Sequence, residues 1–255
     1  MEDSRYNTLL IVEGEKCEYK YFSKFASLIS KDRRIKIVPF CNDIYEIYKS
    51  IKELDGDTTT IDVLLYCLNL NEDQKEILIK NKFVYIYLVF DLELQNDRIE
   101  NQKDSLSKIE EMLNLFNNET SEYGKLFINY PMMESYRHFK IDDVKTLENK
   151  TITSTNEVLI NYKNIVGMEG DNKNIYSYTL NDFYNICKAH LMQAMLLITN
   201  CFKIPTINDY YEHLLPINLH LVQQEIILKK KIMFVLNTSS FIYAEFYQGV
   251  FNKKN

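Results

Sequence analysis

The first half of the chain alternates short apolar runs with amphipathic stretches. Apolar runs bounded by turn residues are typical of buried strands, and they occur at residues 9–12, 35–40, 83–90 and 125–130. Amphipathic stretches typical of helices occur at residues 18–30, 44–54 and about 97 to 116. Strands that alternate with helices in this way pair in parallel through right-handed crossovers. The pattern therefore predicts an α/β fold, a parallel sheet flanked by helices.

One helix of this half has a clear amphipathic pattern, and one segment has an irregular pattern. Residues 44–54 place their apolar side chains on one face, and Asn42 or Asp43 is the expected N-cap of that helix. Residues 58–82 lie between two predicted strands and have a less regular pattern. We expect a helical insertion there, with one helix beginning at Asn71-Glu72-Asp73.

The pattern changes near residue 140. Residues 141–171 are polar and rich in asparagine, which favours a loop-bearing insert, whereas residues 181–200 have the composition of a long, largely buried helix. Helices are also predicted at residues 207–214, 219–234 and 241–251. We therefore expect a domain over residues 1–140, with its insertion at about 58–82, and a mainly helical subdomain over residues 141–255. A helical layer covering the sheet is the alternative arrangement.

Composition and charge narrow the class of protein. A net charge of −6 argues against a nonspecific nucleic-acid binder, which usually has a basic face, but it does not exclude a nuclease with an acidic metal site. The five cysteines are scattered, odd in number and without a CxxC pair, so we expect a reducing, cytoplasmic location and several cysteines in the core. No apolar stretch has the length of a membrane span, so we expect a soluble protein without membrane contact.

Acidic residues follow three of the predicted strands. Glu13 follows the first strand, Asp91 and Glu93 follow the most apolar strand, and Glu134 follows the last strand. Carboxylates gathered at one edge of a parallel sheet repel one another unless cations lie between them. Oxygen ligands without histidine or cysteine favour Mg²⁺ or Mn²⁺ over zinc. The sequence therefore predicts a metal site suited to phosphoryl chemistry at this edge.

A structural explanation of the same acids has to be weighed against this one. Acidic residues often follow strands because they cap the next helix, and Asp97 is placed to do so. Glu15 or Glu18 would likewise favour the start of a helix electrostatically. For any single acid this explanation is the simpler one, whereas the coincidence at three strand ends supports the metal site.

The same residues resemble a known family. A strand followed by Glu13-Gly14, and a later strand followed by Asp91-Leu92-Glu93, is similar to a Toprim domain. The string Glu13-Gly14-Glu15-Lys16-Cys17-Glu18 is similar to the EGE-K-T-E string of the RloB group, within a wider set that includes the OLD-type nucleases. The segment from Asn129 to Tyr136, with Pro131 and Glu134, resembles that group's motif after its last core strand. The resemblance covers residues 8–140.

The resemblance implies a fold, a site and a setting. It implies a Toprim-like domain in which Glu13 is the general acid/base or a metal ligand, Asp91 and Glu93 hold Mg²⁺ or Mn²⁺, and Glu134 is a further ligand, with Glu18 supporting them. It implies a nuclease of a bacterial anti-phage, abortive-infection system that acts on DNA or RNA. The implied partner is an ABC-type or OLD-like ATPase; formation of a homo-oligomer is left open.

Two residues depart from the family pattern. Glu93 stands where a second aspartate is usual, and Cys17 stands where threonine is usual. The longer arm of Glu93 can weaken or reposition a metal. A weakened site leads to the alternative function, a catalytically inactive scaffold that docks the ATPase. A primase- or phosphatase-type enzyme is a third reading, disfavoured because the sequence contains no recognisable nucleotide-handling domain.

Other candidate residues add little to this picture. His138 and Arg137 follow Glu134 closely enough to reach the same site, His138 as a proton carrier or phosphate contact and Arg137 as a phosphate contact. Packing roles are the simpler explanation for both. The chain has no Gly-rich phosphate loop, so ATP binding is assigned to the partner. The aromatic-rich segment after residue 234 is most simply core, or else a surface for a partner.

Overall fold

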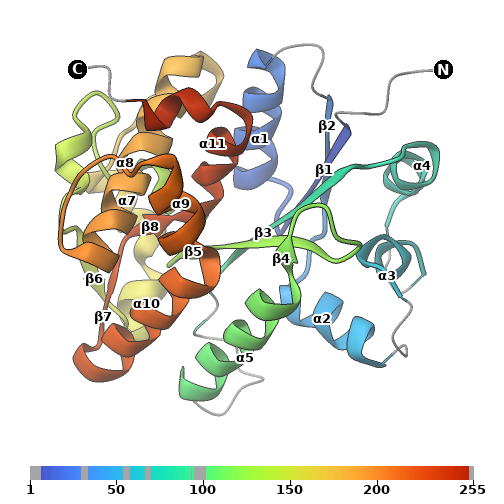
Figure 1. The fold of residues 1–255 in the computed structure, drawn as a ribbon, viewed down its shortest axis with the longest axis horizontal. Coiled ribbons are helices and arrows are strands. Elements are labelled where there is room, and N and C mark those ends of the chain that lie inside the picture. The colour runs from blue at the N-terminus through green and yellow to red at the C-terminus, as the bar shows by residue number, and fades with distance from the viewer. Residues whose placement is uncertain are drawn as a thin grey trace. The chain divides into compact units, whose positions relative to one another are not determined.

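The computed structural model describes residues 7–29, 34–53, 58–66, 70–92, 94 and 102–252 as an α/β protein with a mixed, mostly parallel sheet (Figure 1). The strand order is β2-β1-β3-β5-β4, and β8 also pairs with β5. Residue contacts divide the chain into two compact units, residues 1–90 with 112–127 and residues 91–111 with 128–255. The predicted boundary near residue 140 is a different division, and it stays a prediction.

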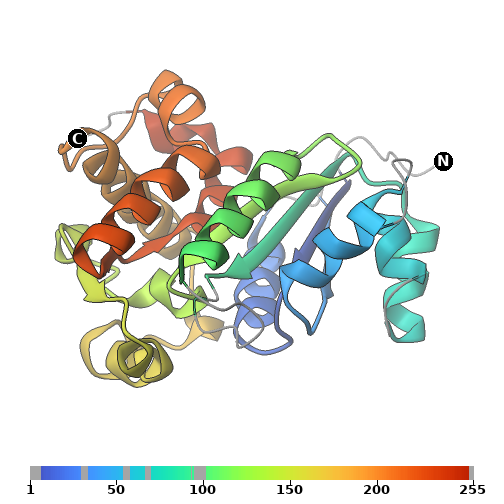
Figure 2. The same ribbon diagram turned by 90° about the horizontal axis from the view of Figure 1, so that it is seen from below.

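Strand β1 (Asn7–Val12) is the centre of the first unit. It pairs in parallel with β2 (Arg34–Pro39) and with β3 (Tyr85–Asp91). Its four consecutive apolar residues are completely buried, as expected for a strand covered on both faces. Helix α1 (Cys17–Leu28) covers one face and α2 (Ile44–Glu53) the other (Figure 2). The predicted β-α-β-α-β order is confirmed here.

The predicted helical insertion consists of α3 (Thr60–Tyr66) and α4 (Glu72–Lys80). Asn71 caps α4, because its side chain accepts from the Gln74 amide while the Gln74 side chain accepts from the Asn71 amide. The Gln74 side chain also donates to the Pro39 carbonyl at 3.1 Å. The start predicted at residues 71–73 is therefore confirmed, and α4 is tied to the end of β2.

The expectation of a purely parallel sheet was incomplete. Strand β5 (Gly124–Tyr130) forms an antiparallel hairpin with β4 (Asn117–Asn118), and β8 (Leu236–Asn237) pairs antiparallel with the other end of β5. Both added strands have two residues, too few to produce an alternating pattern in the sequence. Helix α5 (Gln102–Leu115) precedes the hairpin. The predicted cap Asp97 lies outside the described residues.

Gly124 is fixed by the hairpin. It has φ of +87°, and a Cβ there would lie 2.7 Å from Ile86 Cγ2 and 2.9 Å from the Ile86 carbonyl oxygen. We expect Gly124→Ala to lower the free energy of unfolding by about 2 kcal/mol, because backbone strain and this overlap add. Gly167→Ala is the control, since that Cβ would meet nothing within 4 Å on a helix and should stabilise by up to about 1 kcal/mol. Urea unfolding followed by circular dichroism measures both, and equal stabilities would contradict the assignment.

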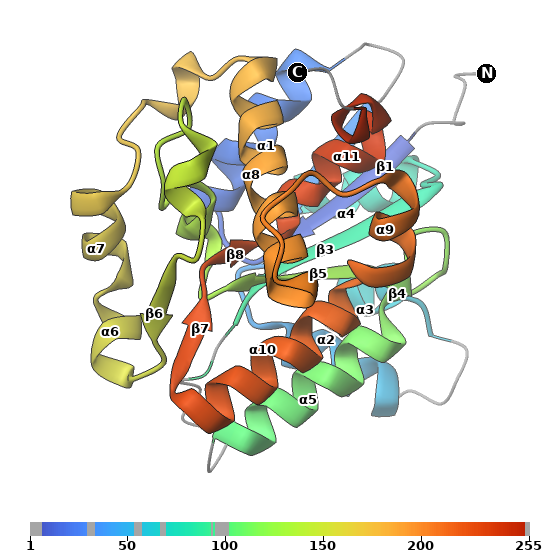
Figure 3. The ribbon, with the colours of Figure 1, turned by 60° about the vertical axis from the view of Figure 1, so that its left-hand side comes forward.

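Helix α8 (Leu180–Thr199) is the buried centre of the second unit. The Thr179 side chain accepts from the Asp182 amide, and Asp182 in turn accepts from Thr179, which forms a capping box. Beside it, β6 (Thr151–Thr153) pairs antiparallel with β7 (Ile232–Phe234), and α6 and α7 follow β6 (Figure 3). The bounds of the two short helices are Asn156–Ile160 and Tyr162–Glu169.

One prediction for this unit was incomplete and another was wrong. The insert predicted at residues 141–171 does contain loops, but it also contains a 3₁₀ turn, a strand and two helices that were not predicted. The helix predicted over residues 219–234 ends earlier: α10 is Pro216–Lys230, Lys231 is its left-handed C-cap, and β7 follows. Three lysines in a row at this end give the helix a favourable C-terminus but do not continue its apolar pattern.

The remaining helices of the second unit complete its core. They are α9 (Ile207–His213) and α11 (Ile242–Phe246), flanked by the 3₁₀ turns Thr238–Phe241 and Gln248–Phe251. Helix α10 runs beside α5 (Figure 3), where His220 Nε2 donates to the Leu106 carbonyl at 2.9 Å. Leu236, Phe241 and Val250 are buried, so the core interpretation of the final segment is confirmed.

Cysteine positions and helix hydrophobicity test two further expectations. Cys187 is buried and Cys17 is partly buried, whereas Cys41 and Cys201 are exposed. Cys67 lies outside the described residues. The expectation of several core cysteines thus holds for Cys187 alone among the described ones. Within the ranges that the structure describes, no helix combines the length and apolarity needed to cross a bilayer.

Candidate functional site

Glu13 is held by its backbone at the carboxyl end of β1. Its amide donates to the Val89 carbonyl of β3 at 3.1 Å, and its carbonyl accepts from the Cys41 amide at 2.8 Å, just after β2. The strand ladder therefore continues one residue beyond Val12 on both sides. The Glu13 side chain is half-buried. The carbonyl end of a parallel strand is where α/β proteins place ligands, as the sequence predicted for this residue.

Gly14 lets the Glu18 carboxylate approach the same turn. Glu18 lies in the first turn of α1 and is 8% exposed. A Cβ on Gly14 would lie 2.9 Å from Glu18 Oε2, so any larger residue there would displace this carboxylate from its present position. Glu18 is therefore next to the Glu13 turn in the first unit, in agreement with a supporting role. Glu15, in contrast, is exposed.

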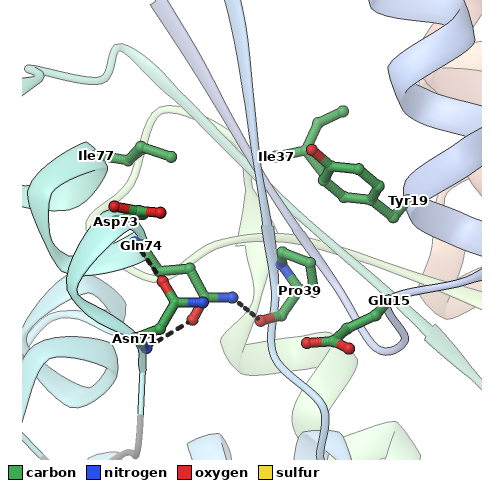
Figure 4. Close-up of a pocket in the computed structure, with 8 residues that line it drawn as sticks. All are labelled: Glu15, Tyr19, Ile37, Pro39, Asn71, Asp73, Gln74 and Ile77. Carbon is green, nitrogen blue, oxygen red and sulfur yellow. Dashed lines mark hydrogen bonds between the residues drawn. The ribbon is translucent and has the colours of Figure 1, made fainter.

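Glu15 lines a groove between α1, the end of β2 and the start of α4 (Figure 4). The groove has a volume of about 290 Å³, and its other lining residues include Tyr19, Ile37 and Asp73. Glu15 and burial together raise the pKa of Cys41, burial being the larger cause, to about 11. None of the predicted metal ligands lines this groove, so the acids that matter for the predicted site lie elsewhere.

Asp91 and Glu134 are brought together in the second unit. Asp91 is the last residue of β3, and Glu134 lies in the 3₁₀ turn Met133–Arg137 that follows β5. Asn129 Nδ2 donates to Asp91 Oδ1 at 3.4 Å. Both carboxylates act on one hydroxyl: they raise the pKa of Tyr162 well above its ordinary value, after burial, which is the largest cause. Two of the predicted ligands therefore influence the same buried hydroxyl electrostatically.

One oxygen of Glu134 is unsatisfied. Oε1 forms an ion pair with Lys163 Nζ at 3.2 Å, whereas Oε2 is buried and has no hydrogen-bond partner. The whole residue is only 8% exposed. A buried carboxylate oxygen without a partner costs on the order of 1–3 kcal/mol or more, so native proteins rarely leave one unless it binds something. A water molecule or a cation at this oxygen would supply the missing partner.

A buried polar network supports the segment that carries Glu134. Asn237 Nδ2 donates to the Met133 carbonyl at 3.1 Å and to Ser135 Oγ at 3.2 Å, so it holds the residues on both sides of Glu134. Asn237 Oδ1 accepts from the Ser240 amide at 3.0 Å. Asn237 is completely buried. Sequence reasoning missed this residue, which lies more than one hundred positions from Met133 and Ser135.

The observed contacts of Arg137 and His138 differ from those that the sequence predicted. Arg137 donates to the Asp171 carbonyl at 2.9 Å, so its guanidinium pins the segment after α7. His138 is 1% exposed and lies between Tyr162 Oη, 3.0 Å from Nδ1, and Glu169 Oε2, 3.1 Å from Nε2. The His138 ring is therefore held between two side chains of α7.

Helix α7 supplies three site residues that sequence reasoning missed. Tyr162, Lys163 and Glu169 contact His138 or Glu134 from this helix. The helical spacing of Tyr162, Val166 and Glu169 was the available signal, because residues four and seven apart share a helix face. It was obscured by the polar, asparagine-rich sequence around it.

The donor set of the site is acidic and oxygen-rich. Glu93, a predicted ligand, lies outside the described residues. Among the residues that are described, no group of three His, Cys, Asp or Glu side chains could hold a metal ion. Asp91 and Glu134 still fit Mg²⁺, which is commonly bound by one or two carboxylates with water and phosphate oxygens completing its shell. The unsatisfied Glu134 oxygen agrees with such a ligand.

Comparisons with known proteins give no assignment. No family model matches the chain, and neither a curated protein nor a solved structure does.

Proposed function

We propose that this chain is a metal-dependent, nuclease-like effector of a bacterial anti-phage defence system, which cleaves nucleic acid under the control of a partner ATPase. The proposal of metal-dependent chemistry rests on one observation: Asp91 and Glu134 act on the same buried hydroxyl, and Oε2 of Glu134 has no hydrogen-bond partner. The defence setting, the ATPase and the Toprim-like fold rest on the motif resemblance alone. The cytoplasmic location rests on the cysteine pattern, and the separate helical subdomain rests on the helical pattern after residue 140.

The roles of the residues follow from their chemistry. Asp91 and Glu134 would hold Mg²⁺ or Mn²⁺, with Glu93 as a further ligand, and the metal would supply charge stabilisation at a phosphate. Glu13 would move a proton, a role that rests on the resemblance. Glu18 would keep the Glu13 turn in place. Lys163 would neutralise Glu134 until a divalent cation binds, because its ammonium already contacts Oε1.

A catalytically inactive scaffold that docks the ATPase is the second candidate. One observation favours it: Lys163 already supplies a positive charge to Glu134, so the ion pair by itself explains a buried carboxylate. The two candidates differ in what a divalent cation does to the folded protein. A metal ligand set binds the cation and gains stability from it, whereas a scaffold does not.

We expect Mn²⁺ or Mg²⁺ to raise the melting temperature of the wild-type chain and to leave Glu134→Gln nearly unchanged. A cation at one hundred times its dissociation constant adds about 2.7 kcal/mol to stability. For a chain of this size that corresponds to a rise of roughly 5–10 °C. Lys163→Met should respond at lower metal concentration than wild type, because it removes a competing cation. Thermal denaturation across a metal titration measures all three.

The matched control is Glu157→Gln, which changes an exposed glutamate of α6 in the same unit. It should keep the full wild-type response. A wild-type melting temperature that is insensitive to both metals would reject the metal site and favour the scaffold.

A further inference from the structure

Strand β2 is an edge of the described sheet, and part of its backbone has no partner there. Val12 of β1 faces Pro39 in the parallel register, and the Phe40 amide donates to the Val12 carbonyl at 2.7 Å. In a parallel pair, alternate residues of a strand bond to the neighbouring strand. The backbone groups of Ile35 and Ile37 therefore point away from β1, and no hydrogen bond to them occurs on that side within the described residues.

The same edge is closed at the C-terminal end of β2. Pro39 has no backbone N–H, and its carbonyl already accepts from the Gln74 side chain of α4 at 3.1 Å (Figure 4). Proline and a covering element are common means by which proteins keep a further strand from a sheet edge. The protection stops at Pro39, so Ile35 and Ile37 are the residues at which an added strand can pair.

The groove between α1 and α4 lies beside this open part of the edge. Tyr19 of α1, Ile37 of β2 and Ile77 of α4 give it apolar walls (Figure 4), and all its lining residues belong to the first unit. Tyr19 is 42% exposed, so its ring is available for contact. The volume of about 290 Å³ is at the lower limit of the roughly 300–1,000 Å³ typical of small-molecule pockets. The groove therefore suits one or two side chains of an extended segment.

Two carboxylates give the groove a negative charge. Glu15 precedes α1 and Asp73 lies in the first turn of α4, and both residues are exposed. Neither carboxylate forms an ion pair within the part of the chain that the structure describes. A lysine or arginine can lay its aliphatic part on the Tyr19 ring while its charged end reaches these carboxylates. A basic side chain is therefore the complement of this groove.

A second copy of β2 does not supply such a side chain. Side chains alternate between the two faces of a strand, so Ile35, Ile37 and Pro39 are on the groove side. The basic residues Arg34 and Lys36 are on the opposite face. A symmetric, antiparallel pair of β2 strands would thus present apolar side chains to each groove. Charge complementarity favours a different, basic partner.

We propose that the groove and the β2 edge form a docking site for a partner protein, which adds an extended segment to β2 and places an arginine or lysine between Glu15 and Asp73. Backbone hydrogen bonds to Ile35 and Ile37 would supply affinity, and the groove would select the basic side chain. No described candidate metal ligand lines the groove, so the docking site stands or falls independently of the proposed function.

The first test locates a bound peptide on the backbone. The probe is a synthetic heptapeptide that alternates valine with arginine, added to the ¹⁵N-labelled full-length chain. Amide hydrogen exchange followed by nuclear magnetic resonance should slow about tenfold or more at Ile35 and Ile37. The Val38 amide already bonds to β1 and should exchange at the same rate with and without the peptide. Unchanged exchange at Ile35 and Ile37 with saturating peptide would overturn strand addition.

The second test measures the affinity of the fluorescently labelled peptide by anisotropy. Glutamate in place of each arginine of the peptide should abolish measurable binding. Glu15→Gln and Asp73→Asn should each weaken binding of the arginine peptide roughly 2- to 5-fold. Glu72→Gln is the matched control, because it removes a charge from the same turn of α4 without lining the groove, and it should bind as wild type does. Equal affinity in all four chains would contradict the role of the groove.

Backbone methylation of the peptide separates strand addition from simple charge attraction. Methyl groups on every second peptide nitrogen block one edge of the added strand, and the alternate set blocks the other edge. One of the two methylated peptides should therefore bind about tenfold or more weakly than the other. Equal binding of both would reduce the contact to charge attraction and reject the docking mode. Sedimentation that shows a dimer, which the arginine peptide dissociates, would assign the edge to a second copy and reject it as well.

Discussion

Replacing Asn237 by alanine is expected to lower the free energy of unfolding by about 4 kcal/mol. Few single substitutions cost as much, and those that do include substitutions that break a buried hydrogen-bond network. The side chain donates to the Met133 carbonyl and to Ser135 Oγ, and its oxygen accepts from the Ser240 amide and from Ser239 Oγ at 3.0 Å. All these groups are buried. Alanine removes the side-chain acceptor of the Ser240 amide and one donor to the Met133 carbonyl, in a buried part of the second unit where water does not replace them.

The loss should also reach the site. Met133 and Ser135 flank Glu134, so their release frees the turn that aims the carboxylate. Thermal and urea unfolding, with the Mn²⁺ response measured beside them, would record a lower stability and a weaker metal effect. Asn164→Ala is the control, because Asn164 is exposed on α7 and should change stability by no more than about 0.5 kcal/mol.

A second variant separates the hydrogen bonds from the shape of the side chain. Asn237→Asp keeps the size and one acceptor oxygen, but it removes both donors and buries a charge. It should be at least as unstable as the alanine variant at neutral pH. Wild-type stability in either variant would show that the network contributes little, and the account of how Glu134 is held would have to change.

The same network shows why only part of the fold could be predicted. Strand β1 and helix α8 have regular apolar spacing, and spacing is a local property that a sequence displays directly. Strand β8 has two residues, and Asn237 meets Met133 across 104 positions of the chain. No local pattern encodes such a pair. A run of Asn, Thr and Ser is typical of a loop, although here burial and mutual hydrogen bonds make it core.

The candidate site, too, could be predicted from the sequence only in part. Asp91 and Glu134 could be located because acids after strands of a parallel sheet gather at one edge. Lys163 and Glu169 could not, because their helix lies in a polar insert and their role depends on which face docks. The unsatisfied Glu134 oxygen is a property of packing alone. The sequence therefore suggested which acids to consider, whereas the Lys163 ion pair at Glu134 and the hydrogen bonds of His138 with Tyr162 and Glu169 required the structure.

Asp91→Asn is expected to reduce nucleic-acid cleavage by roughly 100- to 1,000-fold, the equivalent of about 3–4 kcal/mol of transition-state stabilisation. The amide is the same size as the carboxylate, and its oxygen can still accept from Asn129 Nδ2, which lies 3.4 Å from Asp91 Oδ1. The fold should therefore survive while the charge that attracts the metal is lost. A melting curve without metal that matches wild type would confirm this separation.

The measurement is cleavage of labelled single- and double-stranded DNA and of RNA by the complete chain, with Mg²⁺ and with the proposed partner ATPase. Asp142→Asn, a change at an exposed aspartate of the same unit, should cleave at the wild-type rate. Glu13→Gln should lose activity by a similar factor if Glu13 moves a proton, but it should keep the Mn²⁺ response that Asp91→Asn weakens. This difference separates a proton carrier from a metal ligand.

Combining the changes tests whether Asp91 and Glu134 act together. Ligands of one cation are not additive, so the Asp91→Asn, Glu134→Gln double variant should cleave no more slowly than the slower single variant. Losses that multiply would assign the two carboxylates to independent tasks and would contradict a shared metal. Undiminished cleavage by Asp91→Asn would show that Asp91 takes no part in the reaction, because a neutral amide cannot replace the negative charge that the proposed metal site needs.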